Sequence, residues 1–231
     1  MFLMGYGPQL LAGTLETIQL AVLSLAVSLV LGLCAASCKL FAPSRLLRFG
    51  AAVYTTVIRG IPDLVLLLLI FFSLQLYLND LTDALSLPYI DIEPFSAGVA
   101  TLGFIYGAYF TETFRGAFMA VPRGQLEAGI AYGMSRWQVF SRILFPQMMR
   151  HALPGLENNW LVLLKATALV SLIGLNDLVK VAQNAGNVTF HMFLFISITG
   201  LIYLALTTLS NSVFYLLNRR YSVGIKKAEL W

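Results

Sequence analysis

The chain has 231 residues, of which 58% are hydrophobic and only 11% charged, and its mean hydropathy is +0.80. Soluble domains carry about 25% charged residues, so this composition excludes an ordinary soluble protein and indicates a membrane protein. The net charge is +4. The positions of the Lys and Arg residues along the chain indicate how it is oriented in the membrane. They are a poor argument for nucleic-acid binding.

Five apolar stretches are long enough for a transmembrane helix, which takes about 20 residues. They predict an all-α membrane protein with five spans, in a single transmembrane domain over residues 1–231. The expected spans are Leu10–Cys38, Ala51–Leu78, Phe95–Met119, Leu156–Leu175 and Met192–Leu217.

The cations predict which end of each span faces the cytoplasm. If the N-terminus is outside, most of the 15 Lys and Arg residues lie on the cytoplasmic side, and Lys180 alone lies in an outer segment. The reverse orientation would violate the positive-inside rule. The cytoplasmic set is Lys39, Arg45, Arg48, Arg123, Arg136, Arg142, Arg150, Arg219, Arg220, Lys226 and Lys227. We therefore expect a periplasmic N-terminus and a cytoplasmic C-terminus, in a tail that reads RRYSVGIKKAEL.

Two charges open the second expected span, where the sequence reads Arg59-Gly60-Ile61-Pro62-Asp63. Charges inside a membrane are expensive, and they usually face protein or a water-filled path. One interpretation is structural: Arg59 and Asp63 are one turn apart and neutralise each other near the proline. The other is functional: both residues line a path for solutes.

The third expected span carries small and charged residues. Gly103 and Gly107 form a small-xxx-small face, which is typical of close helix packing. Glu112 lies three residues before Arg115, a spacing that favours an ion pair at the helix end. A place for Glu112 in the substrate path is the alternative.

The segment Glu127–Pro146 is polar although it lies between long apolar runs, and its local signals predict a helix–turn–helix. Gly133 suits the left-handed conformation that ends a helix. Ser135 and Gln138 have the spacing of a capping box, which begins the next helix. On the cytoplasmic side of the membrane, such an element within residues 120–150 can present a rigid knob to a soluble partner.

The fourth expected span contains Asn159 and Lys165. Lys165 is too deep in the apolar run for its ammonium group to reach the surface easily, so it needs an anionic or carbonyl partner. That partner could be Asp63 or Glu112, in a structural tie. Alternatively, Lys165 and Asn159 line the route and hold the carboxylate of a substrate.

The spacing of Glu127–Pro146 resembles the EAA coupling loop of ABC importer permeases, which reads E-A-A, three residues, G, nine residues, I, one residue, L-P. The positions that match are Glu127, Ala128, Gly133, Ile143 and Pro146. Gly129 replaces the third alanine and Phe145 replaces leucine, so both positions remain small or apolar. The resemblance implies that these residues and Gly129 dock an ATPase subunit.

Other segments resemble the polar amino-acid uptake family of these permeases, in particular the Q-type membrane subunit of histidine/lysine/arginine/ornithine importers. They include RGIPDLV, GFIYGAYFTETFRGAFMAVP and RRYSVG. Many amino-acid permeases read R-G-T-P-L-L where this chain has Asp63 in place of the first leucine. The resemblance therefore favours a substrate path that includes Arg59, Asp63, Glu112, Asn159 and Lys165, and the added acid suits cationic solutes.

The same resemblance implies an assembly in the bacterial inner membrane. It contains a second homologous permease, so that the two form a heterodimer, two ATP-binding cassette subunits and a periplasmic amino-acid-binding protein. ATP and Mg²⁺ would bind to the cassette subunits, whose closure would rock the spans between inward-open and outward-open states. This chain is expected to bind no cofactor or metal and to have no catalytic residue, so it is not an enzyme itself.

The sequence contains no GxxxxGK[ST] phosphate loop, and no Ser/His/Asp or His/Cys constellation stands out. Two other classes remain as alternatives to an ATP-driven importer. A membrane scaffold would use the cytoplasmic hairpin only to tether a partner. A secondary transporter would use an ion gradient with this chain alone, although the odd number of expected spans and the lack of an inverted repeat disfavour it.

Overall fold

The computed structural model describes residues 2–221, with the side chains from Leu3 onward, and these residues form a helical protein without strands. A short 3₁₀ turn, η1 (Phe2–Gly5), precedes the long first helix. The helices are α1 (Gly7–Phe41), α2 (Arg45–Gly60), α3 (Asp63–Ala84), α4 (Pro94–Met119), α5 (Arg123–Ala131), α6 (Arg136–Val139), α7 (Phe145–Ala166), α8 (Leu178–Thr189) and α9 (Met192–Tyr221). A π-helical turn, η2 (Phe140–Leu144), joins α6 to α7, and a 3₁₀ segment, η3 (Thr167–Ile173), continues α7. Lys226 and Lys227, which we expect on the cytoplasmic side, lie outside the described residues.

Four helical segments among the described residues are long and apolar enough to cross a membrane. They are Gly7–Phe41, Asp63–Ala84, Arg136–Ile173 and Met192–Tyr221. The expected third span coincides with α4, which has 26 residues but is absent from this set. Its glycines, tyrosines and threonines and the pair Glu112 and Arg115 make it less apolar. A helix surrounded by protein need not be as apolar as one that faces lipid.

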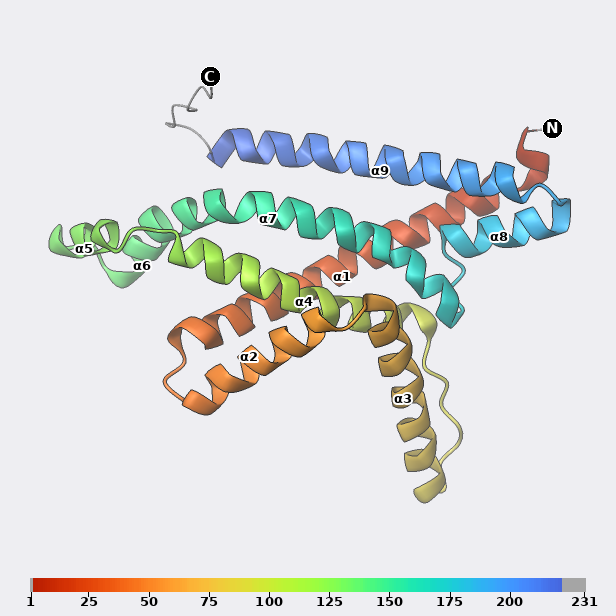
Figure 1. The fold of residues 1–231 in the computed structure, drawn as a ribbon, viewed down its shortest axis with the longest axis horizontal. Coiled ribbons are helices and arrows are strands. Elements are labelled where there is room, and N and C mark those ends of the chain that lie inside the picture. Colours follow the sequence, from red (N-terminus) through yellow and green to blue (C-terminus); the bar gives the residue numbers. More distant parts are fainter. Residues whose placement is uncertain (1, 222–231) are drawn as a thin grey trace.

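The long helix α4 lies at the centre of the bundle (Figure 1). Its contact with α1 is more extensive than the contact between any other two helices. The α1 face toward α4 is built from small residues, among them Ser24, Ser28 and Gly32. A Cβ added at Gly32 would lie 2.7 Å from Phe110 Cβ, and one added at Gly103 would lie 2.5 Å from Val27 Cγ1. The two helices can therefore approach this closely only because these positions are glycines.

The second expected span, Ala51–Leu78, is wrong as a single helix. The chain breaks after Gly60, because Ile61 is extended (φ −111°, ψ 140°) and precedes Pro62. Proline disfavours the helical conformation in the residue before it, so α2 ends there and α3 restarts at Asp63 in another direction. Figure 1 shows α3 projecting steeply away from the bundle of the other long helices.

The helix that contains the fourth expected span, Leu156–Leu175, begins earlier than the apolar run. α7 starts at Phe145 and contains Pro154 in its interior. The helix continues through the proline because Ala152, Leu153 and Leu156 are buried on either side of it. Apolar surroundings and tight packing retain helices that proline would break in water. Lys165 consequently lies near the C-terminal end of α7 instead of at its middle.

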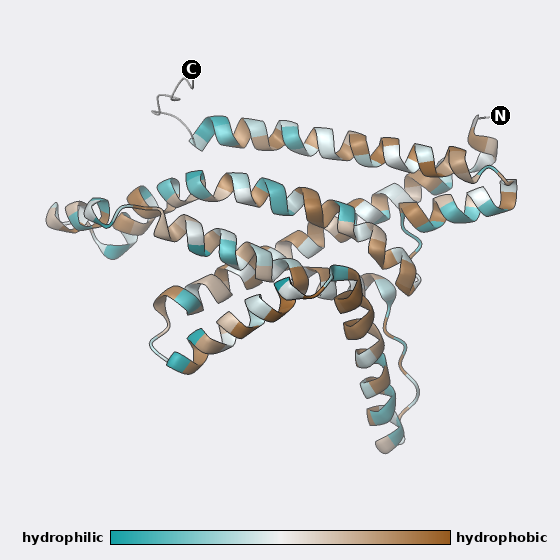
Figure 2. Cartoon of the chain, viewed as in Figure 1, coloured by the Kyte–Doolittle hydropathy of each residue, from teal (hydrophilic) through white to brown (hydrophobic). Residues whose placement is uncertain are grey.

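Hydrophilic residues lie at both ends of the bundle, at the far end of α3 and at separate positions along α7 (Figure 2). One end holds the α1–α2 connection, α5, α6 and the last turn of α9, and the other holds the start of α1 and α8 (Figure 1). The first end therefore carries most of the described cations that the sequence assigns to the cytoplasm, and Arg142 and Arg150 follow in η2 and the first turns of α7.

Candidate functional site

The polar segment between α4 and α7 folds into two short helices joined at Gly133. α5 ends at Ala131, and Gly133 has φ +76°, the left-handed conformation that glycine adopts without strain. Ser135 Oγ accepts a hydrogen bond from the backbone N–H of Gln138, and Oε1 of the Gln138 side chain accepts one from the backbone N–H of Ser135. The turn and the capping box that the sequence predicts are therefore both present.

Two of the motif residues contact each other inside this hairpin. Gly129 is buried, and a Cβ added to it would lie 2.6 Å from Cδ1 of Ile143. The glycine at this position thus makes room for the isoleucine fourteen positions later, and the contact holds α5 against the π-helical turn. Glu127 and Ala128, on the neighbouring positions of α5, are exposed. The remaining motif residues differ in burial: Gly133 is exposed, and Pro146 is half-buried at the start of α7.

Large apolar side chains that sequence reasoning missed are exposed on the same hairpin. Ile130 is 62% exposed, Tyr132 89% and Trp137 71%, and Trp137 stacks on Phe140 with ring centroids 5.7 Å apart. The sequence did hold a signal for these side chains. They are apolar residues that do not share the helix face of Val139 and Ile143, so the hairpin itself cannot bury them. Exposed aromatic residues beside arginines mark surfaces that bind other proteins.

The break between α2 and α3 brings two charges against two tyrosines of α4. Asp63 Oδ2 accepts a hydrogen bond of 2.8 Å from the Tyr106 hydroxyl, and the Arg59 guanidinium lies 5.5 Å from the centroid of the Tyr109 ring. Within the described residues Arg59 and Asp63 form no ion pair. The neutralising pair is therefore wrong, because the one-turn spacing holds only in an unbroken helix and Pro62 breaks this one.

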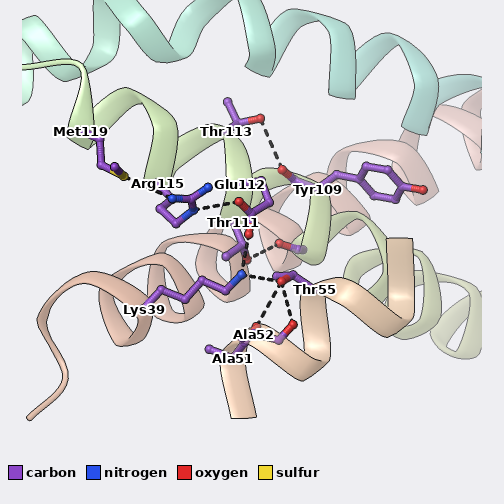
Figure 3. Close-up of polar contacts among 11 residues, drawn as sticks. Lys39, Ala51, Ala52, Thr55, Tyr109, Thr111, Glu112, Thr113, Arg115 and Met119 are labelled. Carbon is purple, nitrogen blue, oxygen red and sulfur yellow. Dashed lines mark hydrogen bonds and ion pairs between the residues drawn. The ribbon is translucent and has the colours of Figure 1, made fainter. Parts of the chain in front are cut away.

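Glu112 joins three helices near the end of the bundle that carries the α1–α2 connection (Figure 3). Its two carboxylate oxygens pair with Lys39 of α1 and, at 2.8 Å, with Arg115 of α4. The Lys39 ammonium also donates to Thr55 of α2. The ion pair with Arg115 is the one that the sequence predicts, whereas Lys39 is a partner that only the fold could bring close. With two cations beside it, Glu112 has little capacity left for a cationic solute.

Asn159 and Lys165 are not brought together. The Asn159 amide donates to Thr113 Oγ1 of α4 over 3.0 Å, whereas Lys165 is exposed on another face of α7. Within residues 2–221, Lys165 forms no ion pair. The structural tie from Lys165 to Asp63 or Glu112 is therefore wrong: Asp63 bonds to Tyr106, and Glu112 is held by Lys39 and Arg115.

Asp177 is a buried acid in the connection before α8 that the sequence analysis did not single out. Its side chain is fully buried and caps α8, since Oδ1 accepts a hydrogen bond of 2.9 Å from the Lys180 amide. The other oxygen, Oδ2, has no hydrogen-bond partner among the described residues. Burial raises the pKa of this carboxyl from 3.8 to about 6, although hydrogen bonds from the α8 N-terminus act in the opposite direction.

This pKa predicts that Asp177→Asn removes a pH dependence of stability. An acid with a raised pKa in the folded state makes folding less favourable as pH rises from its ordinary pKa to about 6, and the loss persists above that. Asparagine caps helices as well as aspartate does but carries no charge. We expect Asp177→Asn to raise the Tm in detergent by ~3 °C or more at pH 7.5 and to leave it unchanged at pH 4.

The control is Asp177→Ala, which removes the cap as well as the charge and should have a lower Tm than Asp177→Asn at every pH. Equal melting profiles for the wild type and Asp177→Asn between pH 4 and 7.5 would contradict the raised pKa.

Among the described residues, no group of three or more His, Cys, Asp or Glu side chains could hold a metal ion. What the structure offers is a bundle of long apolar helices, charges at a helix break, and a hairpin with exposed aromatic residues at one end. These features are typical of a membrane-spanning protein with an exposed surface suited to a protein partner.

The chain belongs to the family of binding-protein-dependent transport system inner membrane components, which it matches over residues 28–223. It is 56% identical over 228 residues to the histidine/lysine/arginine/ornithine transport system permease protein HisQ of Escherichia coli, covering 99% of this chain and 100% of that one. It is 40% identical over 216 residues to the arginine ABC transporter permease protein ArtQ of Haemophilus influenzae, covering 94% of this chain and 90% of that one. A crystal structure of an amino acid ABC transporter with histidines contains a chain of the same fold, with a TM-score of 0.78, 32% identity, and coverage of 93% and 95%.

Proposed function

We propose that this chain is a membrane-spanning permease subunit of an ATP-driven importer for cationic amino acids: histidine, lysine, arginine and ornithine. The observation that carries the proposal is the identity of 56% with HisQ, which extends over 99% of this chain. The arginine permease relative at 40% identity supports the same substrate class. The chain contributes no catalysis, and it converts the motions of other subunits into access to one side of the membrane or the other.

In this function the hairpin of α5 and α6 is the docking element for an ATPase subunit. Its exposed Ile130, Tyr132 and Trp137 would be covered by that subunit, and the EAA-type residues around Gly133 would set the hairpin's shape. η2 connects the hairpin without interruption to α7. A displacement of the docked hairpin would therefore move α7 as a rigid body, and alternating access requires such a movement.

Five spans fit this function, with α4 as the central one in addition to the four more apolar segments. The end of the bundle with α5 and α6 would face the cytoplasm, so that the N-terminus is periplasmic and the C-terminus cytoplasmic. The distribution of lysine and arginine supports this orientation.

The complete importer would contain a second permease in a heterodimer, two ATP-binding cassette subunits and a periplasmic binding protein. ATP and Mg²⁺ would bind to the cassette subunits, and this chain would bind no cofactor. Within this chain, Asp63 with its neighbour Arg59 is the best candidate for contact with a passing solute. The charge of Glu112 is already matched by two cations, and Asn159 is bonded to α4.

The test is ATP hydrolysis by the complete complex reconstituted with its binding protein. Lysine, arginine, histidine and ornithine should each stimulate hydrolysis at least fivefold, whereas leucine and glutamate should not. A complex whose ATPase carries a substitution of its phosphate-loop lysine is the control, and it should lose both hydrolysis and uptake.

Uptake that survives in this control but stops when the ion gradient is collapsed would indicate a secondary transporter. A complex that neither transports nor responds to any amino acid would indicate a scaffold.

A further inference from the structure

One face of α7 carries a seam of residues that no other part of the described chain covers. All five members are exposed, and they follow each other at spacings of three or four residues. They are His151, Pro154, Asn158, Val162 and Lys165. This spacing places them in one line along a helix, and the seven-residue intervals from His151 to Asn158 and on to Lys165 match the repeat with which two helices pack.

The other faces of α7 are already occupied. Asn159 bonds to Thr113 of α4, and Glu157 accepts a hydrogen bond of 3.3 Å from Asn218 of α9. Between α7 and α9 lies an open groove of about 670 Å³, which Pro154 and Asn158 line. The seam therefore stays open although α9 runs close by.

Lys165 makes the seam unsuited to lipid. It interrupts an apolar run that reads WLVLLKATAL, within the membrane-crossing segment Arg136–Ile173. Its ammonium group has no ion pair among the described residues. A lysine inside a membrane is costly unless a carboxylate or a carbonyl faces it, and intramembrane polar residues almost always face protein or water.

We propose that this seam is the surface on which a helix of the second permease subunit packs, with a carboxylate of that helix opposite Lys165. The inference rests on the proposed function, because it takes the working transporter to contain two permease chains. Charge complementarity selects the partner: the partner must be within the membrane to reach the seam, and it must carry an acid at the depth of Lys165. The heptad spacing adds that the partner presents a helix roughly parallel or antiparallel to α7.

Photo-crosslinking in membranes that contain the complete transporter tests the location. Asn158 and Val162 are replaced one at a time by photoreactive p-benzoylphenylalanine, and Leu204 of α9, which is 61% exposed, serves as the lipid-facing control. We expect an adduct with the second permease from positions 158 and 162, at least tenfold above the yield from 204. Adducts with lipid alone, or with the ATPase or the binding protein, would overturn the inference.

Variants of Lys165 test the charge. Lys165→Glu should reduce the amount of second permease that copurifies with this chain by at least tenfold, and Lys165→Arg should retain it. If Lys165→Glu and Lys165→Gln leave copurification unchanged and instead raise the substrate concentration for half-maximal ATP hydrolysis, the ammonium group binds substrate and the inference is wrong.

The crosslinking result is independent of transport. A transporter that imports cationic amino acids but gives no crosslink at 158 and 162 would refute the seam and leave the proposed function intact. A crosslinked pair of permeases that transports no amino acid would support the seam and refute the proposed function.

Discussion

Gly133→Val should lower amino-acid uptake more than tenfold while the chain remains in the membrane at its normal level. Gly133 has φ +76°, and a β-branched residue in this conformation costs ~1–2 kcal/mol. A Cβ at this position would meet no heavy atom within 4 Å. The defect would therefore come from the backbone alone: the turn would adopt another conformation and shift α5 relative to α6. Such a shift would misplace the exposed side chains that we assign to ATPase docking.

Gly124→Val is the matched control for this experiment. Gly124 lies in the first turn of α5 of the same hairpin, its Cβ would also meet nothing within 4 Å, and its backbone has no positive φ. We expect Gly124→Val to retain most of the uptake. ³H-arginine uptake and immunoblotted membrane levels, measured side by side, check both variants. Normal uptake by Gly133→Val would remove the turn from the coupling mechanism.

The hairpin could be predicted from the sequence because its determinants are local. A left-handed glycine and a capping box each depend on residues within three or four positions, and both are present at Gly133, Ser135 and Gln138. The contact of Gly129 with Ile143 was not predicted, because it joins two residues fourteen positions apart that only the folded hairpin brings together. The exposure of Trp137 depends on how the hairpin packs as a whole, which no local rule describes.

The errors in the membrane region have the same physical origin. Hydropathy finds apolar runs but is insensitive to the direction of a helix, so the break at Pro62 was hidden inside one expected span. The same measure began the fourth apolar run at Leu156, just after Pro154, whereas packing carries the helix through this proline from Phe145. The partners of the charges, Lys39 for Glu112 and Tyr106 for Asp63, lie 73 and 43 positions away. Sequence reasoning considers spacing along one helix, and these pairs come from different helices.

Asp63→Asn should impair the uptake of lysine and arginine more than that of histidine at neutral pH. A cationic side chain that leaves water needs an anionic or carbonyl group in its place. Asp63 has one oxygen bonded to Tyr106 and no ion pair with Arg59 in the described part of the chain, so its charge is not neutralised there. One such charged contact is worth ~1.5–3 kcal/mol, which corresponds to roughly a tenfold to hundredfold loss for lysine and arginine. Histidine is largely neutral at pH 7.5 and should lose less.

Two further variants separate this role from a structural one. Tyr106→Phe removes the 2.8 Å hydrogen bond to Asp63 but keeps the charge, so it should affect all three substrates to the same, smaller extent. Arg59→Gln should not rescue Asp63→Asn, because Arg59 lies over the Tyr109 ring and does not pair with the acid. Uptake of the three amino acids by the single variants and by the Arg59→Gln/Asp63→Asn double variant decides between the roles. If all substrates lose uptake equally and the double variant recovers it, then Asp63 only compensates a charge in the fold, and selection for cationic substrates must come from another residue or another subunit.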